Sequence, residues 1–292
     1  MLSPPGATWT EVLYANPTDD NPYGAEVIDG WRTYTAGVVR KAEWLRGALA
    51  PGVADRTNGD PGFSCYWCRT DSSLAVLLTP VIDTTPSHGG YLDLSADGSP
   101  VARYRLYRDG VLIDDEYDVT GTTVPAPATR ATYRVIDEVK RLGFVHSTAA
   151  TVDVTFSSGA GQGGRLPAEW DCGLLNAPSC TVLPILRVTA PLPTTLSGTM
   201  PIGPRLATFT VSHVPGAQRL PITGADVRLS PDNGKTWHRA WTVPRGNGRY
   251  QLLLFNSRAW IGHAIKIKVH ATDAAGGAIT QTVAAAYTVT AS

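Results

Sequence analysis

Apolar and polar residues alternate along most of this sequence, and this period of two constrains the fold more than any other feature. Between 208 and 212, Thr and Ser flank Phe209 and Val211. Between 265 and 270, isoleucine and valine alternate with lysine and histidine. Such a period places one side of a β-strand in a core and the other in solvent. No segment shows the apolar stripe of an amphipathic helix, so the sequence predicts an all-β fold.

β-branched and aromatic runs with this alternation predict strands throughout the chain. Asp109-Gly110 separates two of these runs and is the strongest short-range hairpin signal in the sequence. We expect strands at 8–14, 30–35, 38–45, 74–79, 90–94, 102–107, 111–117, 132–137 and 151–156, and then at 206–212, 224–230, 238–241, 248–254, 264–271 and 279–289.

The length of 292 residues suits about two domains. Prolines punctuate residues 184–193, which is typical of a transition between domains. We therefore expect tandem β-sandwich domains, one at 1–187 and one at 188–292. The first would be jelly-roll-like or fibronectin-like and would hold two local disulfides. About seven short strands in about 100 residues predict an immunoglobulin-like or fibronectin-like sandwich for the second.

The charges balance over the whole chain, with 25 Lys and Arg against 25 Asp and Glu. A formal net charge of zero argues against nucleic acid or an anionic membrane surface as a partner. The sequence also has no run of about 18 apolar residues, so we expect no membrane-spanning helix.

Four cysteines form two closely spaced pairs, Cys65 with Cys68 and Cys172 with Cys180. A four-thiolate zinc site needs two short spacings, and the second pair is too widely spaced for the usual zinc knuckle. A redox C-x-x-C normally opens a helix, whereas a strand-like run follows Cys68. We therefore predict two local disulfides, Cys65–Cys68 and Cys172–Cys180, with zinc and redox chemistry as the weaker alternatives.

The predicted disulfides bear on the compartment, because such bonds form in oxidising surroundings. Residues 1–6 show neither the basic nor the apolar stretch of a secretion signal. We expect an extracellular, secreted protein whose signal peptide is absent from this sequence.

Residues 230–237 fit the Asp-box pattern S-x-D-x-G-x-T-W. In such a turn the aspartate accepts backbone N–H groups, the glycine takes a positive φ, and the tryptophan packs beneath. We expect a structural turn, with sugar contact as the alternative, because a single copy does not make a propeller. The residues of the pattern are Ser230, Asp232, Gly234, Thr236 and Trp237.

Acidic residues near the N-terminus, Asp19 and Asp20, could together with 114–116 offer oxygen ligands to Ca²⁺. A solvated loop and a hairpin edge explain these carboxylates more simply, so we predict no cofactor and keep Asp19 and Asp20 as weak calcium candidates. The six histidines are scattered, and none has a serine or cysteine partner that the sequence supports. We predict no catalytic residue.

Several segments resemble the region that follows the catalytic domain in large secreted actinobacterial subtilisin-like serine peptidases of the Streptomyces type. The likeness covers most of the chain, most clearly from about residue 60 to the end. It rests on 63–71 (FSCYWCRTD), 170–184 (WDC through CTVLP), 227–237 (VRLSPDNGKTW), 270–277 (HATDAAGG), 281–283 and 286–289.

This resemblance implies peptide-bond hydrolysis by a triad upstream of the present residues, and none of the catalytic motifs occurs here. We therefore expect a non-catalytic accessory region that stabilises the enzyme or positions protein substrate. Its partners would be the peptidase domain of the parent chain or a protein substrate. The alternative is an independent extracellular binding or adhesion module for glycan, cell-wall polymer or protein. The eight tryptophans would suit sugar stacking or core packing, and we expect core packing.

Overall fold

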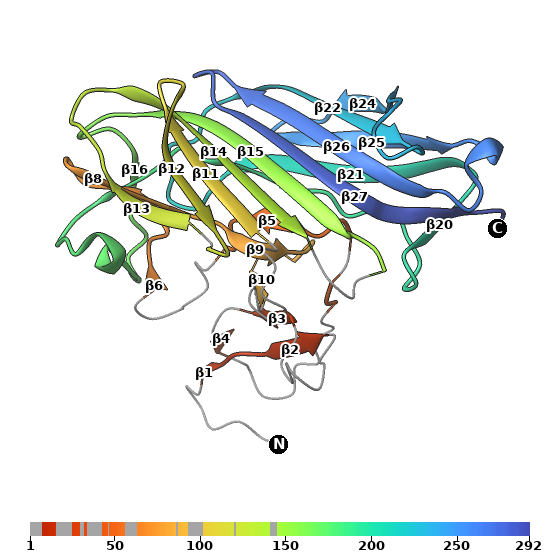
Figure 1. The fold of residues 1–292 in the computed structure, drawn as a ribbon, viewed down its shortest axis with the longest axis horizontal. Helices are drawn as coiled ribbons and strands as arrows, with labels where there is room; N and C mark the ends of the chain where they lie inside the picture. Colours follow the sequence, from red (N-terminus) through yellow and green to blue (C-terminus); the bar gives the residue numbers. More distant parts are fainter. Residues whose placement is uncertain are drawn as a thin grey trace.

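The computed structural model describes residues 8–15, 25–29, 32–33, 43–45, 47–55, 63–85, 87–92, 102–119, 121–140 and 145–292. This part of the chain is all-β, and two shorter sheets pack on one face of a long antiparallel sheet (Figure 1). The predicted class of tandem β-sandwiches is therefore confirmed. The helical elements among these residues are the short 3-10 turns η1 (Gly173–Leu175) and η2 (Arg258–Trp260). Within the same ranges, no helix has the length and apolar character needed to span a bilayer.

The long sheet joins the two halves of the molecule. Strands β15 and β27 pair from Ala149↔Ala284 to Thr155↔Ala278, and their green and dark blue arrows lie side by side in Figure 1. The strand order is β12-β11-β14-β15-β27-β26-β22-β23, and β20 lies parallel to β27. The strands are β11 (Ala102–Arg108), β12 (Val111–Tyr117), β14 (Ala131–Lys140), β15 (Ala149–Ser158), β20 (Thr199–Pro201), β22 (Ile222–Ser230), β23 (His238–Arg239), β26 (Ala264–Asp273) and β27 (Ala278–Thr290).

In the first half, a five-stranded sheet covers the buried face of the long sheet in the order β13-β8-β7-β18-β16. The hydroxyl of Tyr104 donates to the carbonyl of Val76 at 3.0 Å and so links the two layers. The stacked rings of Tyr133 and Phe156 fill the space between them. The strands are β7 (Trp67–Arg69), β8 (Ser73–Leu77), β13 (Gly121–Pro125), β16 (Gly164–Arg165) and β18 (Thr181–Val182).

In the second half, a four-stranded sheet with the order β19-β21-β25-β24 packs against β22, β26 and β27. These seven strands have the order A-B-E-D in one sheet and C-F-G in the other, the topology of a constant-type immunoglobulin sandwich. Phe209 and Tyr250 stack with 5.0 Å between ring centroids on the inner face. The strands are β19 (Leu186–Thr189), β21 (Gly203–His213), β24 (Trp241–Pro244) and β25 (Arg249–Asn256).

Shorter sheets lie beside the first sandwich. One has the order β2-β3-β10-β9-β5, and its strand β5 packs against β14, β15 and β27. The two-stranded sheets are β1 with β4 and, in parallel, β6 with β17. The strands are β1 (Thr8–Trp9), β2 (Val12–Ala15), β3 (Ala25–Ile28), β4 (Arg32–Thr33), β5 (Ala50–Gly52), β6 (Phe63–Ser64), β9 (Thr79–Ile82), β10 (Gly89–Leu92) and β17 (Trp170–Asp171).

Two predicted strands are each split in the structure. The prediction at 238–241 is wrong because the chain changes sheets at Ala240, so that β23 pairs with β22 and β24 pairs with β25. The prediction at 74–79 likewise covers the end of β8 and the start of β9. Residues 74–78 are an unbroken apolar run that continues through the change of sheet, so the sequence pattern did not show this break.

The predicted hairpin at 109–110 is confirmed, since Asp109 and Gly110 have φ values of 49° and 81° between β11 and β12. The predicted domain boundary at 187/188 falls inside strand β19 (Leu186–Thr189). The shared sheet crosses this boundary, and one hydrophobic core contains residues from both sides of it.

Candidate binding surface

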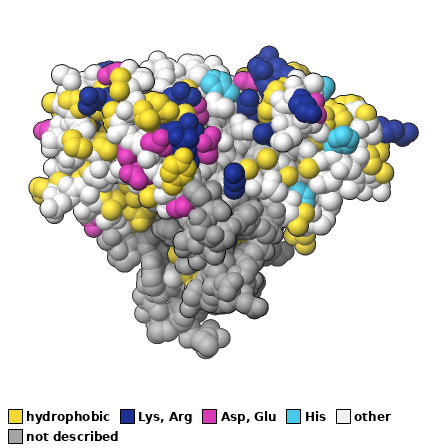
Figure 2. Space-filling view, in the orientation of Figure 1, with side chains coloured by type: hydrophobic (Ala, Val, Ile, Leu, Met, Phe, Trp, Pro, Cys, Tyr) yellow, Lys and Arg dark blue, Asp and Glu magenta, His cyan; other side chains and the backbone are white. Residues whose placement is uncertain are grey.

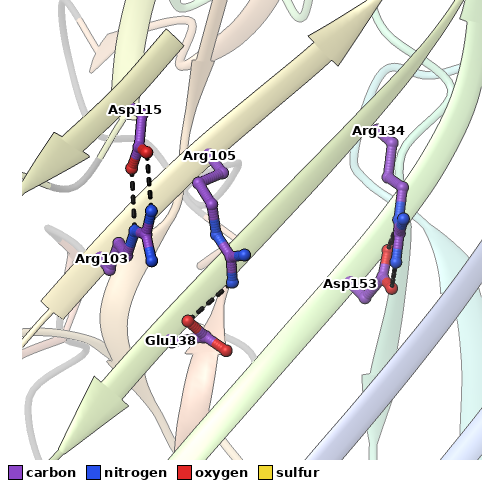
Figure 3. A network of polar contacts seen from close by, with 6 residues as sticks. All are labelled: Arg103, Arg105, Asp115, Arg134, Glu138 and Asp153. Carbon is purple, nitrogen blue, oxygen red and sulfur yellow. Dashed lines mark hydrogen bonds and ion pairs between the residues drawn. The ribbon is translucent and has the colours of Figure 1, made fainter. Parts of the chain in front are cut away.

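Charged side chains on the outer face of the long sheet pair with one another (Figure 3), and charged groups lie among uncharged ones over the molecule in Figure 2. Arg103 donates two hydrogen bonds to the carboxylate of Asp115, at 2.9 and 2.7 Å. Arg134 likewise donates two hydrogen bonds to the carboxylate of Asp153, at 2.8 and 2.6 Å, so both contacts are bidentate. The guanidinium of Arg103 also lowers the pKa of Asp115 through these hydrogen bonds. Since these charges find partners within the sheet, this face is typical of a solvated surface.

The outer face of the four-stranded sheet is different, as strand β25 shows. Its inward residues include Tyr250, Leu252 and Leu254, which are buried as the alternation predicts. Its outward residues begin with polar Arg249 and Gln251 and then continue with Leu253 and Phe255. A period of two would place polar side chains at 253 and 255, so this end of the strand presents apolar residues to solvent.

Neighbouring strands extend this apolar surface. In the sheet register, Leu253 lies directly between Leu206 of β21 and Trp241 of β24. Phe255 lies opposite Pro204 in the same way. Side chains directly opposite on adjacent strands have Cβ atoms about 4.5–5.5 Å apart, so these side chains are in contact range. We call the set the apolar platform: Pro204, Leu206, Trp241, Leu253 and Phe255.

The platform is strongly exposed. The side chains of Leu206, Trp241 and Phe255 retain 63%, 68% and 61% of their accessible surface. Single exposed apolar side chains are ordinary, but a contiguous group of large ones marks an interaction surface. The expectation that tryptophans serve the core therefore fits Trp67 and Trp170 but not Trp241.

The platform was not predicted, although the sequence contains a signal for it. Residues 252–255 read Leu-Leu-Leu-Phe within an otherwise alternating strand. Four consecutive apolar residues cannot all face inward from a strand, so two of them had to point outward.

The balanced total charge conceals an uneven distribution along the chain. Residues 172–292 contain eleven Lys and Arg and only three Asp, a formal net charge of +8. Residues 1–171 contain fourteen Lys and Arg and 22 Asp and Glu, a formal net charge of −8. Most acidic side chains visible in Figure 2 accordingly lie on the left, over the first sandwich. The immunoglobulin-like half is therefore basic, which favours acidic partners.

The predicted Asp-box residues form a tightly hydrogen-bonded turn after β22. The backbone N–H of Thr236 donates to Asp232 at 2.8 Å, and the Thr236 hydroxyl donates to the same carboxylate at 2.6 Å. Ser230 donates to Asp232 at 2.7 Å and accepts from the N–H of Gly234 at 2.7 Å. Gly234 has a φ of 95°. The hydroxyl of Thr236, followed by its N–H and by Ser230, lowers the pKa of Asp232 below its ordinary range.

The ring of Trp237 packs against the turn near Gly234 as expected, but the side chain is only partly buried and so is not a core ring. Its ring lies on the outer face of the long sheet, where the ammonium group of Lys268 sits 4.4 Å from the ring centroid. A cation over an aromatic face is a favourable contact at a surface. The turn thus ends in a surface contact.

All four cysteines lie in pairs at the predicted positions, Cys65 with Cys68 and Cys172 with Cys180. No free cysteine occurs among the described residues. The two loops lie together, because β6 and β17 pair through Phe63↔Trp170. The cysteines therefore belong to one corner of the first sandwich, remote in sequence from the platform.

Two histidines have carboxylate partners that the sequence did not reveal. His88 Nδ1 lies 2.8 Å from Asp83 Oδ2 under the stacked ring of Trp44. His213 Nε2 lies 3.0 Å from Asp273 Oδ2. Asp273 also accepts the N–H groups of Ala275 and Gly277, both at 2.8 Å.

Both pairs are deeply buried, with 2% of His88 and 8% of His213 exposed. The second pair joins the end of β21 to the end of β26 and so holds the two layers of the immunoglobulin-like sandwich together. Burial of a hydrogen-bonded pair between layers is typical of a structural contact.

The calcium candidates Asp19 and Asp20 lie outside the described residues. Within the part of the chain that the structure describes, no group of three or more His, Cys, Asp or Glu side chains is placed to hold a metal ion. The prediction about calcium therefore stays a prediction.

No family model matches the chain, and no curated protein matches it.

Proposed function

We propose that this chain is a non-catalytic, extracellular accessory region of a secreted subtilisin-like serine peptidase, and that it binds protein through the apolar platform. The partner would be a protein substrate or the peptidase domain. The observation that carries the binding role is the exposed row Leu206–Leu253–Trp241 with Phe255 beside it.

The composition of the platform favours protein as the partner. In protein–protein contacts, aromatic side chains near the centre of the interface supply much of the affinity, and the apolar residues around them exclude water. The strand backbones beneath hold these side chains in fixed positions, which lowers the entropy lost on binding.

The peptidase context rests on the resemblance of residues 63–71, 170–184 and 227–289 to the region that follows subtilisin-like catalytic domains. An extracellular location is supported by the two disulfide-bonded pairs. A stabilising or substrate-positioning role needs no catalytic group within this chain.

A second candidate is an independent module that binds glycan or cell-wall polymer. The exposed rings of Trp241 and Phe255 support it, because aromatic faces stack on sugars. The aliphatic side chains of Leu206, Leu253 and Pro204 between and beside them favour the protein partner instead.

The test measures binding of casein, an unfolded protein, to the full chain by biolayer interferometry. The double variant Leu206→Ser/Phe255→Ser should weaken binding by at least about tenfold. The matched control is Val111→Ser/Leu112→Ser, which removes two apolar side chains that are 65% and 45% exposed on the remote strand β12. Control binding should equal that of the wild type.

Both double variants alter exposed residues, so their melting temperatures should stay close to that of the wild type. The proposed protein-binding role would be overturned if the wild type did not bind casein. It would also be overturned if Leu206→Ser/Phe255→Ser bound casein as tightly as the wild type. Binding to insoluble cell wall that is lost in Trp241→Ala, without any binding to casein, would favour the glycan module.

A further inference from the structure

A groove of about 990 Å³ opens beside the platform, at the end of the immunoglobulin-like sandwich. It lies between the loop that follows β21 and the turn that joins β24 to β25. Buried Val211 and Tyr250 contribute to its walls. Its charged lining consists of Arg187, Arg219, Arg249 and Asp55, together with His213.

One arginine of the groove is held in place by neighbours. Arg187 donates through Nε to the hydroxyl of Ser212 at 3.1 Å and through Nη2 to Asp55 at 3.3 Å. These contacts fix its guanidinium group at one wall. Asp55 is the acidic residue that offsets part of the positive charge there.

The other two arginines carry uncompensated charge. Arg219 and Arg249 are exposed, and neither forms an ion pair with any carboxylate of the described residues. The carboxylate of Asp273 is hydrogen-bonded to His213 and forms no ion pair with Arg219 or Arg249. The lining therefore has three guanidinium groups and one carboxylate, that of Asp55, which is paired with Arg187; this leaves a local excess of positive charge.

The chain around the groove contains few carboxylates that could cancel this excess. No Asp or Glu occurs between Asp171 and Asp226 or between Asp232 and Asp273. These stretches supply all four strands of the four-stranded sheet. The positive charge of the groove thus belongs to the whole layer that carries the platform.

The groove and the platform form one continuous track along β25. Arg249, Gln251, Leu253 and Phe255 alternate along the same outer face of this strand. At about 3.4 Å per residue, the track from Arg249 to Phe255 is about 20 Å long. On β21, polar Thr210 and Thr208 lie opposite the first two of these residues. Apolar Leu206 and Pro204 lie opposite the last two.

We propose that the groove binds the carboxylates of an acidic peptide segment whose apolar residues lie on the platform. This inference rests on the proposed protein-binding function and names the class of segment that the site selects. Planar guanidinium groups match carboxylates in paired hydrogen bonds, so Arg219 and Arg249 can hold a run of Asp or Glu beside the Arg187–Asp55 pair. The apolar platform would then bind leucine or aromatic residues about 13–20 Å along the strand.

The two ends of the track favour a peptide over an anionic polysaccharide. A peptide can carry carboxylates at one end and apolar side chains at the other. A uniformly charged glycan would leave Leu206, Leu253 and Phe255 against charged sugar, which gains no apolar burial.

The test uses two synthetic peptides and the full chain. One peptide places four Glu residues six positions before a Leu-Phe-Leu run, and the other has Gln in place of each Glu. Fluorescence polarisation at low salt should show tighter binding of the acidic peptide. In Arg219→Gln/Arg249→Gln this preference should fall by at least about tenfold.

A matched variant controls for the loss of two positive charges. Arg239→Gln/Arg258→Gln removes two exposed arginines of the same basic half that do not line the groove. It should keep the preference for the acidic peptide. Raising the salt concentration should weaken the wild type more than the groove variant, since fewer charge contacts remain in that variant.

The outcomes separate this inference from the proposed function. If Arg219→Gln/Arg249→Gln keeps the preference while Leu206→Ser/Phe255→Ser weakens binding of both peptides, the role of the groove in carboxylate binding is refuted and the platform stands. If the platform variant binds both peptides like the wild type, the protein-binding function itself fails. Tight binding of polygalacturonate that is independent of the platform would replace the peptide with an anionic glycan.

Discussion

The indole rings of Trp67 and Trp170 meet edge to face, with 5.6 Å between their centroids. Trp67 lies within the Cys65–Cys68 loop, and Trp170 stands two residues before Cys172. The N–H of Cys65 donates to the carbonyl of Asp171 at 2.9 Å, which ties the loops together. Two disulfide loops that are distant in sequence therefore form one structural unit.

This arrangement predicts that the two disulfides are energetically coupled. Each small loop should contribute roughly 2 to 2.5 kcal/mol by loop closure. Because the loops share a ring contact and a backbone hydrogen bond, Cys65→Ser/Cys68→Ser and Cys172→Ser/Cys180→Ser should be non-additive by about 0.5 kcal/mol or more. Chemical denaturation of both double variants and of the fourfold variant measures the coupling.

Peptide mapping without reduction provides the control for this experiment, and it should recover Cys65–Cys68 and Cys172–Cys180. Bound zinc or free thiols in protein from an oxidising source would contradict the pairing. Strict additivity would show that the loops act separately.

The second prediction concerns Asp232, whose lowered pKa makes its turn sensitive to acid. The group is bound in its ionised form, so its contribution is present above the ordinary aspartate pKa of about 3.9 and is lost as the pH falls below it. Asp232→Ala should therefore lower the melting temperature at pH 7, and the difference from wild type should shrink at pH 3. Asp226→Ala, which removes a surface partner of Arg228, is the comparison variant.

A difference from wild type that is equally large at both pH values would rule out the ionised carboxylate as the stabilising group. The loss of stability in Asp232→Ala would then come from a change in the shape of the turn alone.

The third prediction compares two tryptophans with different surroundings. Trp67 is fully buried, and Trp67→Ala should destabilise the fold by about 3–5 kcal/mol. Trp237 contacts Lys268 at the surface, so Trp237→Ala should cost only about 0.5–2 kcal/mol. Urea denaturation of the two variants measures both values. Equal losses would mean that Trp237 contributes like a core ring.

The fourth prediction is that the chain has no hydrolytic activity of its own. Acyl transfer needs a nucleophile, a base within hydrogen-bond reach and an oxyanion site that substrate can enter. The two histidine–carboxylate pairs lie deep in the fold and use their carboxylates to hold loops and layers together. The purified chain should neither cleave casein nor react with a fluorophosphonate probe. Labelling of one serine that disappears in His213→Gln or His88→Gln would reveal a catalytic site.

The local parts of the fold were predictable because alternation and turn chemistry act over a few residues. The strand predicted at 279–289 corresponds to β27 (Ala278–Thr290), and Asp109-Gly110 forms the expected turn. The pairing of β15 with β27 was not predictable, because it joins residues more than a hundred positions apart that carry no shared local signal. The meeting of the disulfide loops escaped prediction for the same reason.

For the candidate surface, the sequence contained the signals but not their arrangement. The apolar run at 252–255 and the scarcity of carboxylates after Asp171 are both visible in the sequence. Only the register places Leu206 and Trp241 on either side of Leu253. His213 and Asp273 likewise come together because two strand ends meet across the layers.

The pairing of β15 with β27 also decides how the molecule can be divided. In an immunoglobulin-like fragment that starts at residue 188, the segment Ala278–Ala284 of β27 would lose its pairing partner, strand β15. Unpaired N–H and C=O groups on a long edge recruit other strands. Such a fragment should self-associate, which gel filtration would detect. In the intact chain, strand β15 covers this edge of β27. The two sandwiches can be told apart by topology, but in the shared sheet strand β15 of the first covers an edge of strand β27 of the second.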